Sequence, residues 1–318
     1  MTLHTVNGAD IHRMVPMSAA IEALREVFIE VAEQGPDVFT MPQRQALADG
    51  AVLVMVARHE LSGTAVVKSL SVRLDREPAI VGSLSWLDPN RTTPLVMEAE
   101  AVTTRRTGAV TGLATDLLAP ADADSMALLG SGMQAPDQVR AVQAVRPLGE
   151  LRIVSRRLTN AQRLAHILGP ELPGTRITAW GAENRDAVAT AVAGVAIVSC
   201  ATSAREPVLA LEDLAGQVHV NAIGSFRPSM RELPAELVAE APILAVEQRI
   251  AAMTEAGEII HALDSGARSA ADIWDLGELL LNPPRRSGRT VFKSVGTGMQ
   301  DWAIARVVAE SIDSSSDS

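Results

Sequence analysis

The chain of 318 residues contains no tyrosine and few other aromatic side chains, with four tryptophans and four phenylalanines. A reaction that uses a phenol as proton donor needs a tyrosine, so this absence excludes the Tyr–Lys chemistry of short-chain dehydrogenases. The formal net charge of -10 and the aromatic content of 3% argue against a nucleic-acid surface built from basic patches and stacking rings. We therefore expect no nucleic-acid partner, and a small molecule or a protein instead.

Cysteine and long apolar runs are equally scarce. Cys200 is the single cysteine, so no disulfide can form within the chain. No apolar run reaches the roughly 18 residues that span a bilayer, and the start MTLHTVNGADIHRMV lacks the basic and apolar regions of a secretion signal. These absences predict a cytoplasmic protein with no membrane partner. Six histidines lie without metal-ligand spacing, which predicts no metal: His4, His12, His59, His166, His219 and His261.

The first third of the chain combines helix patterns with strand patterns. Residues 18–33 repeat apolar side chains at three-to-four spacing behind Ser18, which predicts a capped amphipathic helix. Residues 98–119 predict a second helix, opened by Thr103 or Thr104. Between the two helices, three apolar and β-branched segments predict a largely antiparallel sheet: 51–58, 64–74 and 79–88.

From residue 121 onward, strands alternate with helices of about 10 to 15 residues, an order typical of a parallel sheet with crossover helices. The sequence therefore predicts an α/β fold with a Rossmann-type parallel-sheet domain over 121–293, preceded by an α+β domain over 1–120. A last helix follows the polar loop LNPPRRSGRT, and residues 313–318 predict a short disordered tail.

The stretch LLGSGMQA, residues 128–135, places two glycines and an alanine between a strand and a helix. In such a turn the first glycine permits the tight bend, the second lets backbone approach a pyrophosphate, and the small third residue packs the helix on the strand. The helix amino terminus offers free N–H groups to phosphates. We expect a dinucleotide here, in contact with Gly130, Ser131, Gly132, Met133 and Gln134.

The end of the next strand indicates which dinucleotide binds. An acidic side chain there would hydrogen-bond the ribose of NAD, but this strand ends in Ser155, Arg156 and Arg157. A guanidinium can bind a 2′-phosphate through charge-assisted hydrogen bonds. We therefore expect NADPH to be preferred over NADH, with Asn160 among the cofactor residues. The alternative is a solvated basic patch at the start of a helix.

Further cofactor contacts should lie at the carboxyl ends of other parallel strands, where ligands of open α/β sheets bind. We expect them from Thr202 after one strand, which can equally be an ordinary strand end, and from Ile223, Gly224 and Ser225 after the next. The segment VFKSVGTG is expected to close over the nicotinamide. Asp301 begins the last helix, where a carboxylate complements the helix dipole, so we interpret it as structural.

Five blocks of the sequence resemble the ornithine cyclodeaminase/mu-crystallin family in their order and spacing. They are RRTGAVTGLATDLLAP, LLGSGMQA, GQVHVNAIGSFRPSMREL, EAGEI and VFKSVGTGMQD, and the similarity extends from MPQR to Asp301. The resemblance implies a homodimer whose first domain, completed by a helix over 294–312, binds the substrate and forms the dimer contact. It also implies that Arg44, Lys68 and Arg106 hold a substrate carboxylate above the nicotinamide.

Each of these basic residues also has a structural interpretation. Lys68 lies in an apolar strand, where a buried ammonium is costly without a partner, so it is either an edge residue or paired with an anionic ligand. With a lowered pKa it would be a catalytic residue that delivers a proton to the substrate. Arg44 can be a surface residue. Arg105 and Arg106 adjoin near a helix start, where the dipole disfavours cations, so we expect one of them to face an anion.

Two departures from the family pattern bear on activity. In the cyclodeaminases an aspartate follows the NAxGG strand, whereas this chain has Phe226, which cannot accept a proton. Leu53 likewise replaces a glutamate in the strand after MPQR. Ornithine cyclodeamination is therefore disfavoured.

The block GSFRPSMREL is similar to the ketimine reductase branch of the family. That resemblance implies an NAD(P)H-dependent oxidoreductase that converts Δ1-pyrroline-2-carboxylate or Δ1-piperideine-2-carboxylate to L-proline or L-pipecolate. Two alternatives stay open. One is an amino-acid dehydrogenase or opine-like synthase acting on an open-chain imine, and the other is a non-catalytic NADPH-dependent protein that binds a small acid.

Overall fold

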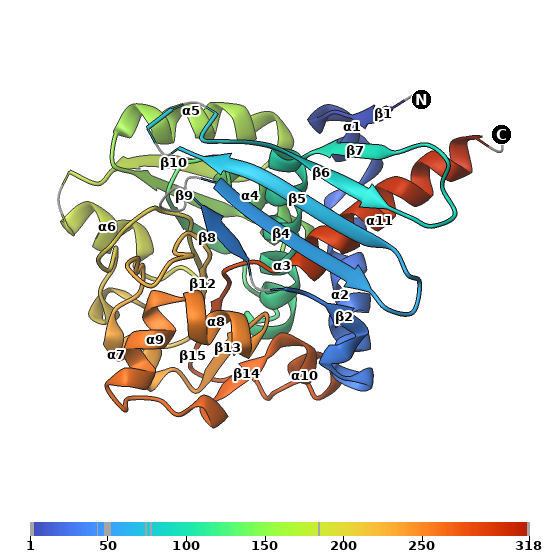
Figure 1. Cartoon of the computed structure of the whole chain (residues 1–318). Helices are drawn as coiled ribbons and strands as arrows, with labels where there is room; N and C mark the ends of the chain where they lie inside the picture. The colour runs from blue at the N-terminus through green and yellow to red at the C-terminus, as the bar shows by residue number, and fades with distance from the viewer. Residues whose placement is uncertain are drawn as a thin grey trace. The chain divides into compact units, whose positions relative to one another are not determined.

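The computed structural model describes residues 3–42, 44–47, 52–73, 75–76, 78–183 and 185–316, and every structural statement below concerns these residues. The chain divides into two compact units. Unit 1 comprises residues 1–109 and 297–318, and unit 2 comprises residues 110–296. Each unit is built on its own sheet (Figure 1).

The sheet of unit 1 is mostly antiparallel. Its strands are β1 (His4–Val6), β2 (Phe39–Thr40), β3 (Gln45–Leu47), β4 (Val52–His59), β5 (Ala65–Val72), β6 (Ile80–Leu87) and β7 (Leu95–Glu98). They lie in the order β1-β7-β6-β5-β4-β2, with β3 paired to β4. Strands β1 and β7 run parallel, and the other described pairs run antiparallel. The three antiparallel strands that the sequence predicts are therefore confirmed as β4, β5 and β6.

Helices cover one face of this sheet. They are α1 (Gly8–Met14), α2 (Met17–Gln34) and α11 (Gly298–Ser316), with a 3-10 turn η1 (Pro36–Val38) after α2. Helix α11 crosses β4 and β5 and packs beside α2 (Figure 1). Helix α2 buries Ile21, Leu24 and Phe28, as its periodicity predicts. The predicted Ser18 cap is wrong, because Pro16, whose ring restricts the backbone, is the N-cap residue.

Helix α3 (Ala99–Leu118) begins earlier than the sequence predicts. Thr103 and Thr104 do not open it but lie within its first turns. The hydroxyl of Thr104 donates to the carbonyl oxygen of Ala101 at 3.1 Å, so it bonds back along the helix instead of capping it.

Helix α11 also extends further than predicted, because residues 313 to 316 are helical rather than a disordered tail. The guanidinium of Arg91 anchors this end. It forms an ion pair with Asp313 and donates to the carbonyl oxygen of Ala309 at 3.2 Å. These contacts hold the polar last turns of α11, and a polar composition alone does not show that such contacts exist.

The sheet of unit 2 is parallel throughout. Its strands are β8 (Ser125–Leu129), β9 (Glu150–Ser155), β10 (Arg176–Gly181), β11 (Ile197–Cys200), β12 (Val218–Ala222), β13 (Ile243–Val246), β14 (Ile273–Asp275) and β15 (Arg289–Lys293). They lie in the order β10-β9-β8-β11-β12-β15-β13-β14. This confirms the predicted Rossmann-type sheet. The strand order reverses between β8 and β11, which makes that point the topological switch point where such sheets bind ligands.

Helices and short turns connect these strands. The helices are α4 (Ala135–Val145), α5 (Leu158–Leu168), α6 (Arg185–Val192), α7 (Ala235–Glu240), α8 (Arg249–Glu255), α9 (Gly257–Asp264) and α10 (Leu276–Leu281). The 3-10 turns are η2 (Gly169–Glu171), η3 (Leu211–Asp213) and η4 (Ala270–Asp272). Two apolar cores result. One joins α4 and α5 to β8 and β9, and the other joins β11, β12, β13 and β15 to α7 and α9.

The segment VFKSVGTG, which the sequence predicts to close over the nicotinamide, begins as the end of β15, between β12 and β13. Val291 and Phe292 are fully buried there, because both faces of a parallel sheet are covered.

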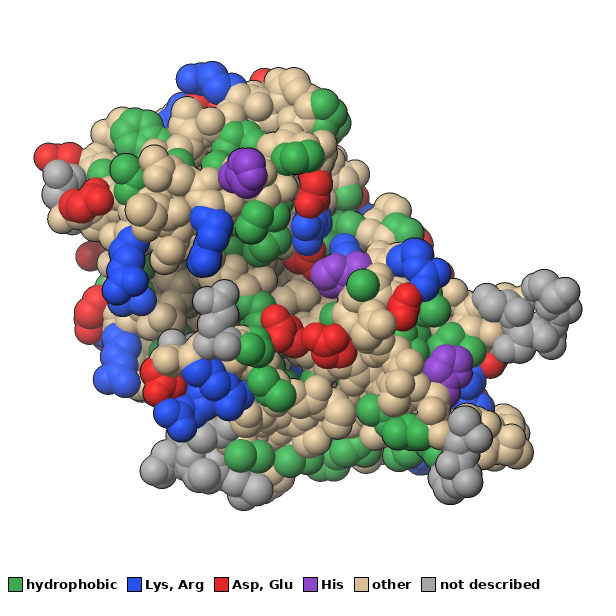
Figure 2. Space-filling model, turned by 90° about the horizontal axis from the view of Figure 1, so that it is seen from above, with side chains coloured by type: hydrophobic (Ala, Val, Ile, Leu, Met, Phe, Trp, Pro, Cys, Tyr) green, Lys and Arg blue, Asp and Glu red, His purple; other side chains and the backbone are tan. Residues whose placement is uncertain are grey.

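Charged side chains of both signs are interspersed over the face of the molecule seen in Figure 2, in keeping with the modest net acidity of the chain. Within the described ranges, every helix is too short or too polar to cross a bilayer.

Candidate active site

The glycine turn of unit 2 connects β8 to α4. Gly130 has a φ of 116°, and a Cβ there would lie 2.3 Å from the carbonyl oxygen of Ala201, just beyond β11. A Cβ on Gly132, by contrast, would meet no described atom within 4 Å. The first glycine is thus needed for the fold, and the second leaves open space beside the turn.

The amino terminus of α4 adjoins this space. Its N-cap residue, Gln134, makes no side-chain capping bond, and the buried Oε1 of Gln134 has no hydrogen-bond partner among the described residues. The first amides of a helix need acceptors from outside it. The turn therefore fits the pyrophosphate of a dinucleotide, which would supply those acceptors. Ser131 and Met133 lie in the same turn.

The carboxyl end of β9 lies beside the turn. The Ser155 hydroxyl lies 2.7 Å from that of Ser131, which joins the two segments. Arg156 and Arg157 are exposed immediately afterwards, and Asn160 is half-buried in the first turn of α5. The structure thus brings the predicted polar and basic residues together at one end of the sheet.

A buried carboxylate, that of Glu232, joins the loops after β11 and β12. Its Oε1 accepts hydrogen bonds from the amide (2.7 Å) and hydroxyl (2.8 Å) of Thr202. Its Oε2 accepts from the amides of Gly224 (2.7 Å) and Ser225 (3.1 Å). A Cβ on Gly224 would lie 2.0 Å from the carbonyl oxygen of Thr202, so glycine is required for this close approach. Ile223 is buried in the same loop.

Further charged groups lie behind Ser225. Its hydroxyl donates to Oε1 of Glu258 at 2.7 Å and accepts from Nζ of Lys293 at 2.6 Å. The same Nζ lies 3.8 Å from Oε2 of Glu258. Glu247 accepts from the hydroxyl of Ser294 and from two amides that follow it. Burial raises the pKa of Glu232 and of Glu247, while hydrogen bonds and Lys293 oppose that rise.

The sequence analysis missed this buried group, which comprises Glu232, Glu247, Glu258 and Lys293. Glu232 lies in RPSMREL, Glu258 in EAGEI and Lys293 in VFKSVG, and these blocks belong to the segments that carry the family resemblance. That resemblance is the signal that could have indicated these three residues. A buried charged residue needs an oppositely charged or hydrogen-bonding partner, but the local sequence does not show which residue that partner is.

In unit 1, the structure brings Lys68 of β5 and Arg106 of α3 to one carboxylate. Nζ of Lys68 lies 2.6 Å from Oδ2 of Asp301, and Nε of Arg106 lies 3.5 Å from Oδ1. Lys68 also donates to the hydroxyl of Thr103 at 3.4 Å, and Arg106 donates to Oε1 of Gln300 at 3.1 Å. The interpretation of Asp301 as a dipole-complementing residue is incomplete, since its main contact is a buried ion pair.

Electrostatics link Arg44 to the same cluster. Burial lowers the pKa of Lys68, Asp301 opposes this fall, and the positive charges of Arg106 and Arg44 add to it, so that the pKa is about 8. With a pKa of about 8, Lys68 is predominantly protonated at pH 7 although it is fully buried. Three cationic side chains thus act on one another around Lys68, and a bound anion would reduce their mutual repulsion. The structure also explains part of the burial of Lys68 without a ligand, through Asp301.

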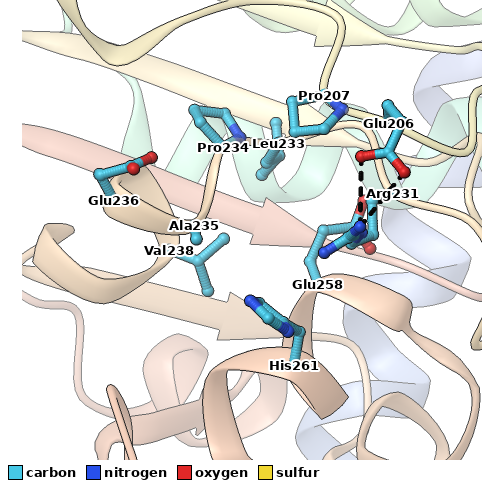
Figure 3. A pocket seen from close by; sticks show the side chains of 10 residues that line it. All are labelled: Glu206, Pro207, Arg231, Leu233, Pro234, Ala235, Glu236, Val238, Glu258 and His261. Atoms are coloured by element: carbon cyan, nitrogen blue, oxygen red, sulfur yellow. Dashed lines mark hydrogen bonds and ion pairs between the residues drawn. The ribbon is translucent and has the colours of Figure 1, made fainter. Parts of the chain in front are cut away.

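A pocket of about 220 Å³ lies elsewhere in unit 2 (Figure 3). Arg231 and Glu206 form an ion pair at its rim at 3.2 Å, and His261 extends toward it from α9. Its lining contains none of the residues that the sequence predicts for cofactor or substrate. We therefore describe two candidate regions, each within its own unit: in unit 2, the glycine turn with the loops after β9, β11 and β12, and in unit 1, the cluster of Lys68, Arg106 and Asp301.

A Rossmann-type sheet with a glycine turn at its switch point, in a chain with a second α+β unit, defines the structural class. The model of the ornithine cyclodeaminase/mu-crystallin family matches residues 5–316. The chain belongs to this family, which confirms the resemblance seen in the sequence.

Named relatives are similar over most of the chain. Ketimine reductase mu-crystallin of Mus musculus is 31% identical over 301 residues, which are 93% of this chain and 87% of that protein. Delta(1)-pyrroline-2-carboxylate reductase of Bacillus cereus is 33% identical over 222 residues, 68% of this chain and 66% of that protein.

Solved structures share the fold. Delta(1)-pyrroline-2-carboxylate reductase of Thermococcus litoralis, in complex with NADH and L-proline, superposes with a TM-score of 0.87 at 26% identity and covers 97% of both chains. An archaeal alanine dehydrogenase dimer with bound NAD superposes with a TM-score of 0.86 at 25% identity, covering 99% of this chain and 98% of that one.

Proposed function

We propose that this protein is an NAD(P)H-dependent reductase of cyclic ketimine carboxylates, acting on Δ1-pyrroline-2-carboxylate or Δ1-piperideine-2-carboxylate to form L-proline or L-pipecolate. The observation that carries the proposal is the buried cluster of Lys68, Arg106 and Asp301 with Arg44 in electrostatic reach. It gathers three cationic side chains, the residue type that a clamp for the carboxylate of such a substrate needs. The relatives named above are reductases of ketimines and of Δ1-pyrroline-2-carboxylate.

The reaction needs little acid–base machinery. A bound nicotinamide supplies a hydride to the imine carbon, and one proton must reach the imine nitrogen. Arg44 and Arg106 bind the substrate carboxylate, which orients the ring and compensates their charge. Lys68, with a pKa of about 8, carries a proton at neutral pH and can donate it.

The role of Lys68 has a direct test. Lys68→Met removes the ammonium but keeps an unbranched side chain of similar length. We expect kcat to fall by about 10² to 10⁴, the usual contribution of a positioned proton donor. Steady-state kinetics that show an unchanged kcat with a raised KM would assign Lys68 to substrate binding alone.

The cofactor proposal rests on unit 2. The residues proposed to contact the dinucleotide are Gly130, Ser131, Gly132, Met133, Gln134, Ser155, Asn160, Thr202, Ile223, Gly224 and Ser225. Exposed Arg156 and Arg157 can bind a 2′-phosphate, which favours NADPH over NADH.

A homodimer is proposed from the second face of the unit 1 sheet. Alternate residues of β4, β5, β6 and β7 leave Val54, Val56, Val67, Val81 and Val96 half-buried or exposed. The register places Ser69, Ser71, Ser83 and Ser85 among these valines. A solvated face of an antiparallel sheet is usually more polar than this, so a face of valines and small serines favours stacking against a second copy. The molar mass in solution tests this proposal. A wild-type protein that is a monomer would contradict it, as would a dimer that Val56→Asp leaves intact.

One alternative has a specific observation behind it, the similarity to an archaeal alanine dehydrogenase. An amino-acid dehydrogenase would use the same carboxylate clamp on an open-chain imine. Cyclodeamination stays disfavoured, because Phe226 packs against an apolar core and Leu53 is buried in another, and neither side chain can exchange a proton.

A single assay separates these functions. The purified protein is mixed with NADPH, and loss of the nicotinamide absorbance is followed on adding Δ1-pyrroline-2-carboxylate or pyruvate with ammonia. Because cyclodeamination causes no net redox change, L-ornithine with NAD is tested by the release of ammonia. Oxidation with the cyclic imine supports the proposal, and oxidation with pyruvate and ammonia alone supports the dehydrogenase. Tight NADPH binding without turnover of any substrate would identify a binding protein instead.

A further inference from the structure

The buried charges at the carboxyl ends of β11 and β12 do not balance. We define the acidic cluster as Glu232, Glu258 and Lys293, whose side chains are almost entirely inaccessible to solvent. Glu232 accepts hydrogen bonds from four donors, Thr202 N, Thr202 Oγ1, Gly224 N and Ser225 N, and only an ionised carboxylate offers acceptors to all of them.

The other two members hold the same loop through hydrogen bonds. Oε1 of Glu258 accepts from the amide of Glu232 at 2.6 Å and from the hydroxyl of Ser225 at 2.7 Å. Lys293 donates to the hydroxyl and carbonyl oxygens of Ser225 and to the carbonyl oxygen of Ala222. Counted at their formal charges, the two carboxylates and one ammonium leave one negative charge. The neighbouring Glu247 is either neutral or negative, so the net charge of the group stays negative in both cases.

The charge lies directly under the loops that would receive the nicotinamide. Thr202, Gly224 and Ser225 take their positions from Glu232, and they follow parallel strands at the edge where ligands of open α/β sheets bind. A nicotinamide is neutral when reduced and cationic when oxidised. A fixed negative charge in a dry site therefore stabilises the oxidised ring more than the reduced one.

We propose that the acidic cluster favours the oxidised over the reduced nicotinamide and so biases the bound cofactor toward hydride donation, the direction of imine reduction. This inference rests on the proposed function, since it assumes that unit 2 binds a nicotinamide dinucleotide. It adds a role for residues that touch neither substrate nor the reacting carbon. Glu232 is therefore a positioning residue: it holds Thr202, Gly224 and Ser225 in place, and its charge acts on the nicotinamide without contact.

The test compares dissociation constants without any imine present. Glu232→Gln removes the charge with little change of shape, and Kd is measured for NADP+ and NADPH by calorimetry. The expected result is that binding of NADP+ weakens about tenfold more than binding of NADPH, because the variant loses one buried charge near the proposed ring site. Glu236→Gln is the matched control, because it removes an exposed carboxylate four residues further along and should leave the ratio unchanged.

A purely structural role for Glu232 gives a different outcome. Loosened loops would weaken both redox forms by the same factor, and an unchanged ratio would overturn the inference. Binding of 2′-phospho-ADP-ribose, which lacks the nicotinamide, checks that the glycine turn is intact. If Glu232→Gln does not fold, Glu258→Gln removes one charge while its amide oxygen keeps the bonds from Ser225 and Glu232, and the same shift in ratio is expected.

The sign can be reversed as well. Lys293→Met makes the cluster more negative and should shift the ratio toward NADP+, opposite to Glu232→Gln. A shift in the same direction for both variants would contradict an electrostatic origin. If the wild-type protein binds neither NADP+ nor NADPH, the proposed function itself fails, whereas wild-type binding with an unaltered ratio in the variants refutes the inference alone.

Discussion

Nζ of Lys68 lies 2.6 Å from Oδ2 of Asp301, and both side chains are buried, with 1% and 0% of their surface exposed. The pair joins β5 to the first turn of α11, two elements of unit 1 from opposite ends of the chain. Removing one partner of a buried ion pair leaves the other charge without compensation. The pair therefore stabilises the fold of unit 1 and, under the proposed function, sets the pKa of the proton donor Lys68.

Asp301→Asn should change the pH profile of the enzyme. Asp301 raises the pKa of Lys68, so without it the pKa falls below about 8 and the protonated lysine is lost at lower pH. We expect the alkaline limb of kcat/KM, near pH 8 in the wild type, to move down by about one unit or more. The variant should also lose roughly 3 to 5 kcal/mol of stability. Glu310→Gln, an exposed change on the same helix, is the control, and a limb that stays in place would refute the pairing.

The two glycines of the turn should respond differently to alanine. Gly130→Ala forces a Cβ to within 2.3 Å of the carbonyl oxygen of Ala201 at a positive φ, and we expect a loss of about 1 to 3 kcal/mol or more. Gly132→Ala has room and should unfold like the wild type, yet it should weaken dinucleotide binding because its methyl group enters the space meant for the pyrophosphate. Thermal unfolding and calorimetric Kd values check the pair. Equal nucleotide affinity in Gly132→Ala and the wild type would argue against this turn as the phosphate site.

The double variant Arg156→Ala and Arg157→Ala tests the cofactor preference. Both guanidinium groups are exposed at the end of β9, so each contributes less than a buried ion pair would. We expect Kd for NADPH to rise about tenfold while Kd for NADH stays the same, because only the 2′-phosphate is lost as a partner. Arg163→Ala, also exposed on α5, should affect neither. A parallel loss for both nucleotides would indicate a general effect on the helix start.

Stability should fall in acid because of His219. This side chain is fully buried between the hydroxyl of Thr290 (2.9 Å) and Oδ1 of Asn221 (3.0 Å), and burial lowers its pKa from 6.5 to about 3. Between these values the unfolded chain binds a proton that the folded chain does not. The free energy of unfolding therefore decreases as the pH falls below about 6.5, by at most roughly 1.4 kcal/mol per pH unit from this residue.

Urea unfolding between pH 7 and pH 4.5 measures this slope. His219→Gln keeps hydrogen-bonding capacity but does not titrate, so its slope should be smaller by up to one proton. His166→Gln, an exposed histidine on α5, should keep the wild-type slope. Identical slopes in His219→Gln and the wild type would rule out His219 as the source.

Local signals made the general architecture predictable from the sequence. The three-to-four spacing of α2, the apolar segments of β4, β5 and β6, and the alternation beyond residue 121 each depend on neighbouring residues only, and the structure confirms them. The glycine turn is predictable in the same way, because eight consecutive residues, LLGSGMQA, are enough to indicate a tight bend between a strand and a helix. By contrast, the boundaries of α3 and α11 were wrong, since back-bonded hydroxyls and the contact of Arg91 decided them.

What the sequence alone determined is thus the parallel sheet, the position of the glycine turn and, through several matching blocks, the family. Only the tertiary structure decided that Asp301 pairs with Lys68, that β15 enters the middle of the sheet, and that Glu232 holds two loops together. The physical reason is that burial makes a charged group dependent on its partner, while the partner lies far away along the chain. Periodicity records which face of an element is covered, but not what covers it.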